Sequence, residues 1–239
     1  MTISGFIKKQ NATLLQDFSK SGYCVVAVAA SKLPDMQRFE DWELEKLPGC
    51  RTSSALVIRK RPTYEAECWV RWDYRGYRKA FAAYLDAFYP EFSDVLNPSL
   101  HVDHLEPRFR FRKGDNYFVR LHLVSSKVNS SYGAGFEQGF YQTERSKPLD
   151  GVVHLSWLGF CKAKGTLLPG KNSGTRAWEQ WARTEAKIFS EDSGELASHA
   201  YVGLLTFLQL GYTRYYAGED KQLDYEAIFK AYDRAHHAS

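Results

Sequence analysis

Short runs of β-branched and apolar residues alternate along the N-terminal part of the chain with a segment of helical periodicity. Strands are predicted over residues 22–32 and 53–61, where such residues follow one another in short stretches. Residues 75–92 carry apolar side chains at helical spacing, and this helix is expected to stop at Pro90. The first 95 residues therefore predict an α/β arrangement.

The middle of the chain predicts a hairpin followed by a helix. The expected elements are a strand over Leu100–His104, a polar loop over Glu106–Asp115 and a strand over Tyr117–Val124. Ser125 or Ser126 can cap the helix, which carries Asn129 in its first turns. Glycines at 133, 135 and 139 predict that this helix is short.

After Pro148 the pattern becomes mostly helical. The expected elements are a strand over 151–160, a loop over 165–175, an amphipathic helix over 176–189 capped by Thr175, an apolar helix over 195–218 and a terminal helix over 224–237. The helix over 195–218 is apolar nearly all round, so we expect it to be buried.

We therefore predict a single α+β domain over residues 1–239, made of three parts. An N-terminal α/β part spans 1–95, the hairpin and helix span 96–145, and a mostly helical part spans 146–239.

Composition agrees with a packed, membrane-free protein. Hydrophobic residues make up 44% of the chain and charged residues 25%, which is typical of globular domains. No run of 18 apolar residues predicts a membrane span, and the N-terminus lacks the apolar region of a secretory signal. The four cysteines have no C-x-x-C spacing, which favours reduced thiols and a cytoplasmic location.

Positive charge is gathered in three clusters, at 59–62, 71–79 and 108–113, although the formal net charge is only +4. The last two clusters interleave aromatic residues with arginine, as nucleic-acid-facing surfaces often do. The alternative is that they are solvated faces of amphipathic side chains. On an extended segment, the arginines of 108–113 would share one face and the phenylalanines the other. Such a segment could also be an edge strand that uses charge against aggregation.

Three residues close together, His101, Asp103 and His104, are candidates for a metal site. The pattern VDHLEP followed by VRLHLVSSKVN resembles the HNH or ββα-metal endonucleases over roughly residues 99–137. The resemblance implies a ββα-metal element embedded between the N-terminal α/β part and the C-terminal helical part. It further implies a metal-dependent nuclease that acts on nucleic acid, with DNA as the first expectation.

The resemblance also implies roles for individual residues. His104 would be the general base, because imidazole titrates near neutral pH. Asp103 would be a metal ligand, Asn129 the second ligand and His101 an extra one. Oxygen ligands suit Mg²⁺ or Mn²⁺, and a histidine ligand shifts the preference toward Zn²⁺ or Ni²⁺. Because Asp103 and His104 are adjacent on a strand, their side chains reach one water only if the strand ends or twists there.

The central Asn of the family, which fixes the first-strand histidine, falls at Arg120 when counted back from Asn129. Either Asn116 does this from a shifted position, or Arg120 replaces it and contacts phosphate. Gly133 stands where a second helix histidine would be, so metal should bind weakly without substrate. Backbone contacts to nucleic acid are expected from the basic side chains Arg108, Arg110, Arg112, Lys113 and Lys127.

Two alternatives stay open. The first is a non-catalytic nucleic-acid-binding module with a decayed ββα element, which Arg120 and the missing second histidine favour. The second is an interaction protein of a phage or toxin system, with His101, Asp103 and His104 as ordinary surface residues. A nuclease of this kind would fit bacterial defence or a toxin, where a protein inhibitor or immunity partner would accompany it. His122, flanked by leucines, is expected to be a satisfied histidine within a sheet rather than a site residue.

Overall fold

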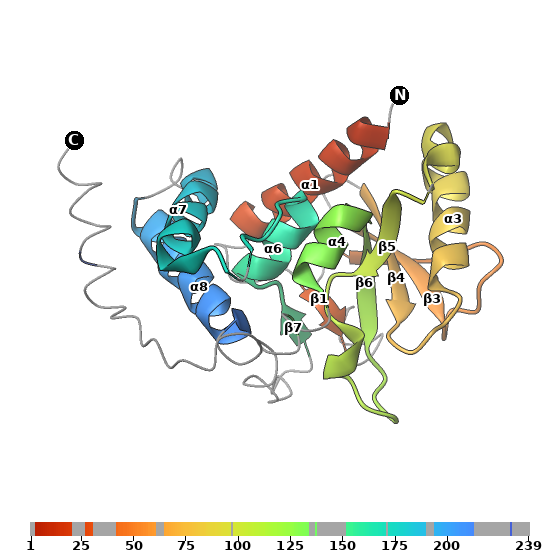
Figure 1. Cartoon of the computed structure of the whole chain (residues 1–239). Coiled ribbons are helices and arrows are strands. Elements are labelled where there is room, and N and C mark those ends of the chain that lie inside the picture. The colour runs from red at the N-terminus through yellow and green to blue at the C-terminus, as the bar shows by residue number, and fades with distance from the viewer. Residues whose placement is uncertain are drawn as a thin grey trace. The chain divides into compact units, whose positions relative to one another are not determined.

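The computed structural model belongs to the α+β class, as predicted. It describes residues 3–20, 27–30, 42–60, 65–96, 98–133, 137, 152–170, 172–189, 194–212 and 230. Element labels follow Figure 1. Among the described residues, no helix is both long enough and apolar enough to cross a membrane.

Seven strands of the described chain form an antiparallel sheet. They are β1 (Ala27–Ala30), β2 (Trp42–Lys46), β3 (Ala55–Lys60), β4 (Glu65–Arg71), β5 (Leu100–His104), β6 (Phe118–Ser125) and β7 (Val152–His154). Their order is β2-β3-β4-β6-β1-β7, and β5 pairs with β6. The longest strand, β6, therefore lies at the centre and contacts three others.

Six α-helices and three short 3₁₀ helices accompany the sheet in the described ranges. The α-helices are α1 (Ile3–Lys20), α3 (Tyr77–Phe88), α4 (Ser126–Tyr132), α6 (Trp157–Lys164), α7 (Gly174–Ala186) and α8 (Gly194–Tyr212). The 3₁₀ helices are η1 (Pro90–Val95), η2 (Arg108–Arg110) and η3 (Lys187–Phe189).

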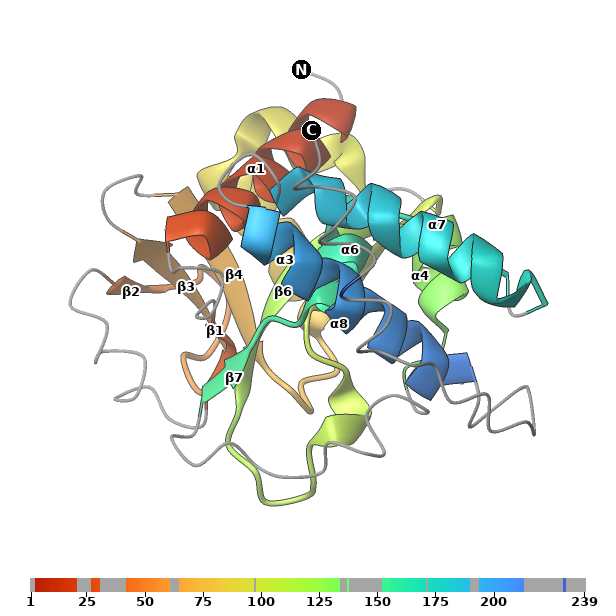
Figure 2. The same ribbon diagram turned by 90° about the vertical axis from the view of Figure 1, so that its left-hand side faces the viewer.

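The chain forms two compact units. Residues 1–130 and 146–165 make up the first unit, which contains the whole sheet. Residues 131–145 and 166–239 make up the second, in which α7 and α8 run side by side (Figure 2). The N-terminal part and the hairpin do not separate, because β4 and β1 both pair with β6.

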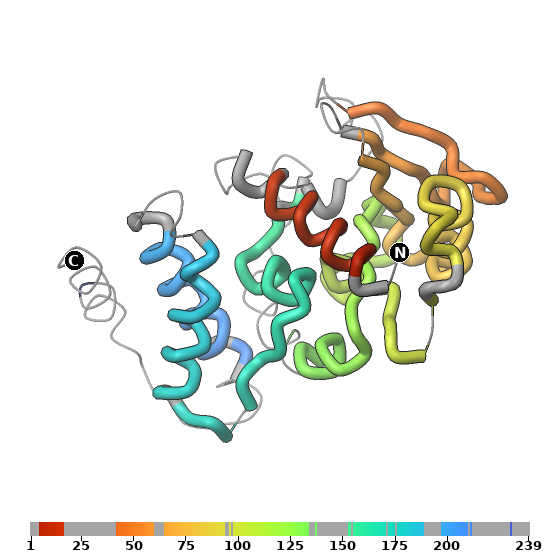
Figure 3. The backbone as a smooth tube through the Cα atoms, turned by 90° about the horizontal axis from the view of Figure 1, so that it is seen from above, coloured from red at the N-terminus to blue at the C-terminus, as the bar shows by residue number. Residues whose placement is uncertain are grey.

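Within the first unit, helices cover both faces of the sheet (Figures 1 and 3). Helix α3 packs on the face that carries the main core, where Phe81 and Leu85 meet Val57 and Leu121. Helices α4 and α6 meet the opposite face, on which polar side chains of β5 and β6 lie. Helix α1 reaches both sides, because its Phe6 packs in the main core and its Asn11 contacts His122 on the polar face. Buried polar groups need partners, and Asn11, Asn129 and Lys162 on these helices supply them for His122, His101 and Asp103.

Several predicted elements agree with the structure, and others do not. The strands around 53–61, 100–104 and 117–124 and the helices from 75, 176 and 195 are present, with shifted ends. The strand predicted over 151–160 is wrong in its second half, because Ser156 caps α6 by accepting a hydrogen bond from the Gly159 amide at 3.0 Å. Helix α1 and strands β2 and β4 were not predicted. The terminal helix over 224–237 and most of residues 22–32 lie outside the described residues.

Candidate functional site

Strands β5 and β6 and helix α4 form a hairpin followed directly by a helix, as the sequence predicts. The two strands pair in register from Leu100 with Ser125 to His104 with Leu121. The Ser125 hydroxyl accepts a hydrogen bond from the Val128 amide at 3.1 Å, so it acts as the predicted cap of α4. The Asp-His pair thus stands at the end of the first strand, and Asn129 stands on the helix.

The strand alternation separates the two residues of the Asp-His pair. Asp103 is cross-strand partner of His122, and His104 is cross-strand partner of Leu121 in the core on the α3 side. The ladder continues past His104, since the Leu105 amide bonds to the Arg120 carbonyl at 3.0 Å. Asp103 and His104 therefore face opposite sides of the sheet, and the expected break between them is not present.

Asp103 is held by a lysine that sequence reasoning missed. Its Oδ2 lies 2.6 Å from the Nζ of Lys162 on α6, and its Oδ1 accepts a hydrogen bond from the His104 amide at 2.9 Å. The Lys162 side chain is only 9% exposed. Gly165 ends α6 with a φ of +91°, a left-handed conformation that glycine adopts without strain, and so fixes the last turn that carries Lys162. Both carboxylate oxygens of Asp103 thus have partners inside the protein.

His101 and Asn129 meet on the same face as Asp103. The Asn129 side-chain amide lies 3.1 Å from Nδ1 of His101, which ties α4 to β5. The structure therefore brings these two predicted ligands together, and each is the other's hydrogen-bond partner.

The donors on this face fit a divalent ion in chemical kind. A carboxylate, an amide oxygen and an imidazole nitrogen are common ligands of Mn²⁺, Zn²⁺ and related ions. Among the described residues, no three His, Cys, Asp or Glu side chains gather closely enough to hold a metal. The position beside Oδ2 of Asp103 is held by the Lys162 ammonium group. A divalent ion at Asp103 would therefore compete with a cation of the protein itself.

His104 is buried on the other face, with 4% of its surface exposed. Its ring lies 4.7 Å from the ring of Tyr77 on α3, and its Nε2 has no hydrogen-bond partner in the described part of the chain. The pKa of His104 is lowered to about 4, mainly because the ring is buried. The negative charge of Asp103 partly offsets this effect, and the positive charges of Arg108 and Lys162 add to it. The imidazole is therefore neutral at pH 7 and able to accept a proton.

His122 is fully buried, as expected of a histidine within the sheet. Its Nε2 lies 3.0 Å from the Asn11 side-chain oxygen on α1. The pKa of His122 is lowered to about 3, mainly by burial and also by the positive charge of Arg120. The negative charges of Glu67 and Asp103 partly offset this effect. The His122 ring therefore holds α1 against β6 as a neutral group.

These two histidines make stability depend on pH. The unfolded chain protonates them near pH 6.5, whereas the folded chain keeps them neutral down to about pH 4 for His104 and about pH 3 for His122. The unfolded state then binds more protons, so the free energy of unfolding is expected to fall as pH drops from about 6.5. Each histidine that is protonated in the unfolded chain and neutral in the folded chain lowers the free energy of unfolding by about 1.4 kcal/mol for every pH unit of acidification. Urea denaturation at pH 7.5, 6 and 5 measures it, and a flat profile would contradict the burial of both rings.

The two candidates for the central position differ in their surroundings. Arg120 is 3% exposed, and its guanidinium lies 2.7 Å from the Glu67 carboxylate on β4. The alternative that Arg120 contacts phosphate at the surface therefore does not agree with its position. Asn116 is exposed at the end of the loop that leads into β6.

The basic loop is not the extended segment that alternation predicts. Residues 108–110 form a 3₁₀ turn, in which Arg110 turns inward to the buried Glu106 carboxylate at 2.5 Å. Phe109 is exposed and Phe111 is buried, so the two phenylalanines do not share a face. Arg110 is thus withdrawn from the predicted phosphate contacts. The exposed members of that set are Arg108, Arg112, Lys113 and, on α4, Lys127.

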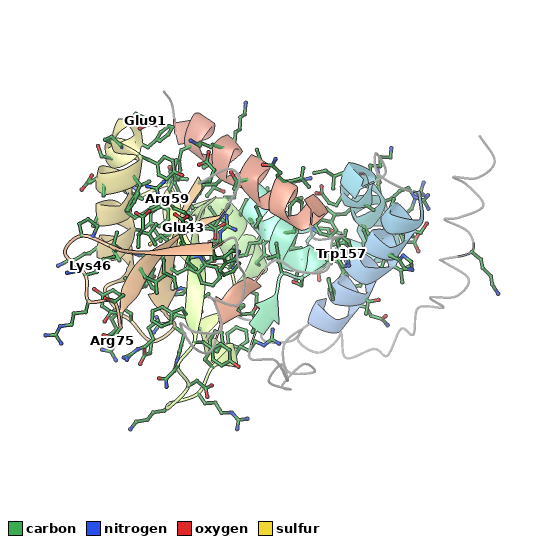
Figure 4. The ribbon with its side chains drawn as sticks, turned by 180° about the vertical axis from the view of Figure 1, so that it is seen from behind. Glu43, Lys46, Arg59, Arg75, Glu91 and Trp157 are labelled. Carbon is green, nitrogen blue, oxygen red and sulfur yellow. The ribbon has the colours of Figure 1, made fainter. Side chains whose placement is uncertain are left out.

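The other basic clusters are partly neutralised. Arg59 bonds to Glu45 across the β2–β3 hairpin, and Arg71 bonds to Asp73. Figure 4 labels Arg59 on this hairpin and Arg75, which is exposed, further along the same unit. These clusters add less free positive charge than their composition suggests.

Comparisons of the chain with protein-family models, with curated proteins and with solved structures find no match. The functional argument therefore depends on the geometry of β5, β6, α4 and α6.

Proposed function

We propose that the chain hydrolyses phosphodiester bonds of nucleic acid, with DNA as the first substrate to test, as an HNH-like nuclease. The observation that carries the proposal is the hairpin–helix unit, whose first strand ends in Asp103 and His104 and whose helix supplies Asn129. The buried Nε2 of His104 adds support, because it has no hydrogen-bond partner in the described part of the chain and is therefore able to accept a proton.

His104 is the proposed general base. Its neutral imidazole accepts the proton of the attacking water, provided that the Tyr77 ring moves aside to admit that water. Arg108 lies near enough to lower the pKa of His104. A phosphate bound to Arg108 would offset this positive charge, so the pKa of His104 rises when substrate is present. Base strength is thereby coupled to substrate binding.

Lys162 and Asp103 form the charged centre on the other face. The ammonium group of Lys162 lies 2.6 Å from the carboxylate and fixes its direction. A divalent ion, Mg²⁺ or Mn²⁺ first and Zn²⁺ or Ni²⁺ as alternatives, would be held by Asp103 with Asn129 and His101, and would neutralise charge on the phosphoryl oxygens. For this ion and His104 to act on one phosphate, the end of β5 would have to turn so that both side chains reach the same face. Exposed Arg108, Arg112, Lys113 and Lys127 would position the backbone of the nucleic acid.

A second candidate is a nucleic-acid-binding module that does not cleave. The Asp103–Lys162 ion pair favours it, because the carboxylate is already neutralised without a metal. The separation of Asp103 and His104 onto opposite faces favours it as well. The exposed basic residues would then bind the backbone without any chemistry.

A nicking assay on supercoiled plasmid separates the two candidates. With Mg²⁺, Mn²⁺, Ni²⁺ or Zn²⁺ present, the protein is expected to nick DNA, and a chelator is expected to stop it. Asp103→Asn should lower the rate about 100-fold, since it removes the charged ligand. Asp86→Asn, an exposed carboxylate on α3, is the matched control and should leave the rate unchanged. DNA binding without nicking by any metal would favour the binding module instead.

A further inference from the structure

The loop between β5 and β6 presents one aromatic side chain to solvent. Phe109 is 44% exposed, whereas Phe111, two residues later, is 7% exposed. An exposed phenylalanine is unremarkable alone, because much of any protein surface is apolar. Its neighbours make it unusual, since exposed Arg108, Arg112 and Lys113 lie on the same loop.

The turn that carries Phe109 is held from beneath. The Arg110 guanidinium bonds to the buried Glu106 carboxylate, and the Nε of Arg108 donates to the Trp72 carbonyl at 2.9 Å. The Phe111 ring packs 5.9 Å from Trp72 and 4.9 Å from Tyr117, measured between ring centroids. The two residues beside Phe109 are thus fixed by side-chain bonds, which limits the entropy lost on binding.

The far end of the loop is also fixed. The Asp115 amide bonds to the Arg112 carbonyl at 2.9 Å, and the Asp115 carboxylate accepts from the Arg112 amide at 2.8 Å. Gly114 has a φ of +98°, which this tight turn requires at its third position and which glycine adopts without strain. Arg112 and Lys113 are therefore presented on a preformed turn.

We propose that Phe109 stacks on an unpaired base of single-stranded nucleic acid, while Arg108, Arg112 and Lys113 contact the adjoining phosphates. The inference rests on the proposed nucleic-acid substrate and adds to it the class of substrate: unpaired strands rather than duplex. Alternating an aromatic platform with cations is how proteins bind single strands without reading sequence. In a duplex the bases are already stacked, so Phe109 gains little there. Phe109 is therefore a binding residue that sets the preference for single strands over duplex, and it is not a catalytic residue.

Binding to end-labelled 20-nucleotide strands and to the matching duplex, measured by fluorescence anisotropy with chelator present to prevent cleavage, tests this. Phe109→Ala is expected to weaken binding of single-stranded DNA or RNA by about 5- to 100-fold and to leave duplex binding unchanged. Phe109→Trp should retain the affinity, and its indole fluorescence should fall when single strand is added. Phe109→Leu should behave like Phe109→Ala, because leucine keeps apolar surface but cannot stack.

Leu167→Ala, at another exposed large hydrophobic residue, is the matched control and should change nothing. Equal loss of single-strand and duplex binding, or full binding by Phe109→Leu, would overturn the inference, as would wild type that binds no single strand. If single strands bind through Phe109 yet nothing is cleaved, the inference stands and the nuclease proposal fails. If DNA is cleaved and substitution of Phe109 does not change single-strand binding, the nuclease proposal stands and this inference fails.

Discussion

Arg120→Met is expected to lower the free energy of unfolding by about 3–5 kcal/mol. The Arg120 and Glu67 side chains are 4% and 2% exposed, and their charged groups lie 2.7 Å apart. The other Glu67 oxygen accepts a hydrogen bond from the Trp69 indole at 3.1 Å. Removing the guanidinium leaves the Glu67 charge buried, and a buried charge without its counterion costs far more than the pair contributes. Urea denaturation at pH 7.5 gives the difference.

The surface pair Arg59–Glu45 provides the matched control. Its side chains are 31% and 38% exposed, so Arg59→Met should cost about 1 kcal/mol or less. The double variant Arg120→Met/Glu67→Met should regain most of the stability lost in Arg120→Met, because no charge then stays buried. A loss below about 1 kcal/mol in Arg120→Met would mean that Arg120 reaches solvent, where a phosphate contact becomes feasible again.

His104→Leu is expected to abolish most cleavage while leaving the fold intact. Loss of a general base lowers rates by about 100- to 10,000-fold. Leucine has a similar size, suits the apolar surroundings beside Tyr77 and removes the unpartnered Nε2, so the free energy of unfolding should stay equal or rise by about 1 kcal/mol. The measurements are the plasmid-nicking rate and urea denaturation of the same preparation.

His122→Leu is the comparison that separates catalysis from packing. His122 bonds to Asn11, so its replacement should cost about 1–3 kcal/mol of stability and leave the nicking rate per folded molecule unchanged. Undiminished cleavage by His104→Leu would show that the base lies elsewhere, most directly among the groups on the Asp103 face.

The hairpin from Leu100 to Ser125 and its following helix could be predicted because their signals are local. Apolar strand residues, the polar loop with Gly114 and a serine cap at Ser125 all lie within one stretch of chain. Asn129 was placed on that helix for the same reason. Strand β4 was missed, since Glu65 and Glu67 interrupt its apolar pattern, and their partners come from α1, from Tyr89 just after α3, and from β6.

The contacts of the site could not be predicted, because they join residues far apart in the sequence. No spacing rule indicates that Lys162 reaches Asp103, since the contact depends on where α6 packs. The alternation of arginine and phenylalanine in the basic loop led to the wrong prediction of an extended segment for a related reason. Glu106 is buried, and its attraction for Arg110 outweighs the preference of a polar loop for an extended form.

Strand β6 pairs with β4 over 118–120, and beyond that point α1 lies beside it. A small cavity there, about 20 Å³, is just large enough for one water and is lined by Phe6, Gln10 and residues of β4 and β6. The side-chain carbonyl of Gln10 accepts the Leu123 amide at 3.2 Å, where a strand would otherwise do so. Amide exchange at Leu123 should therefore report the undocking of a helix rather than the fraying of a sheet. The exchange rate of the Leu123 amide would then measure how often α1 undocks from β6 and exposes the buried polar face to water.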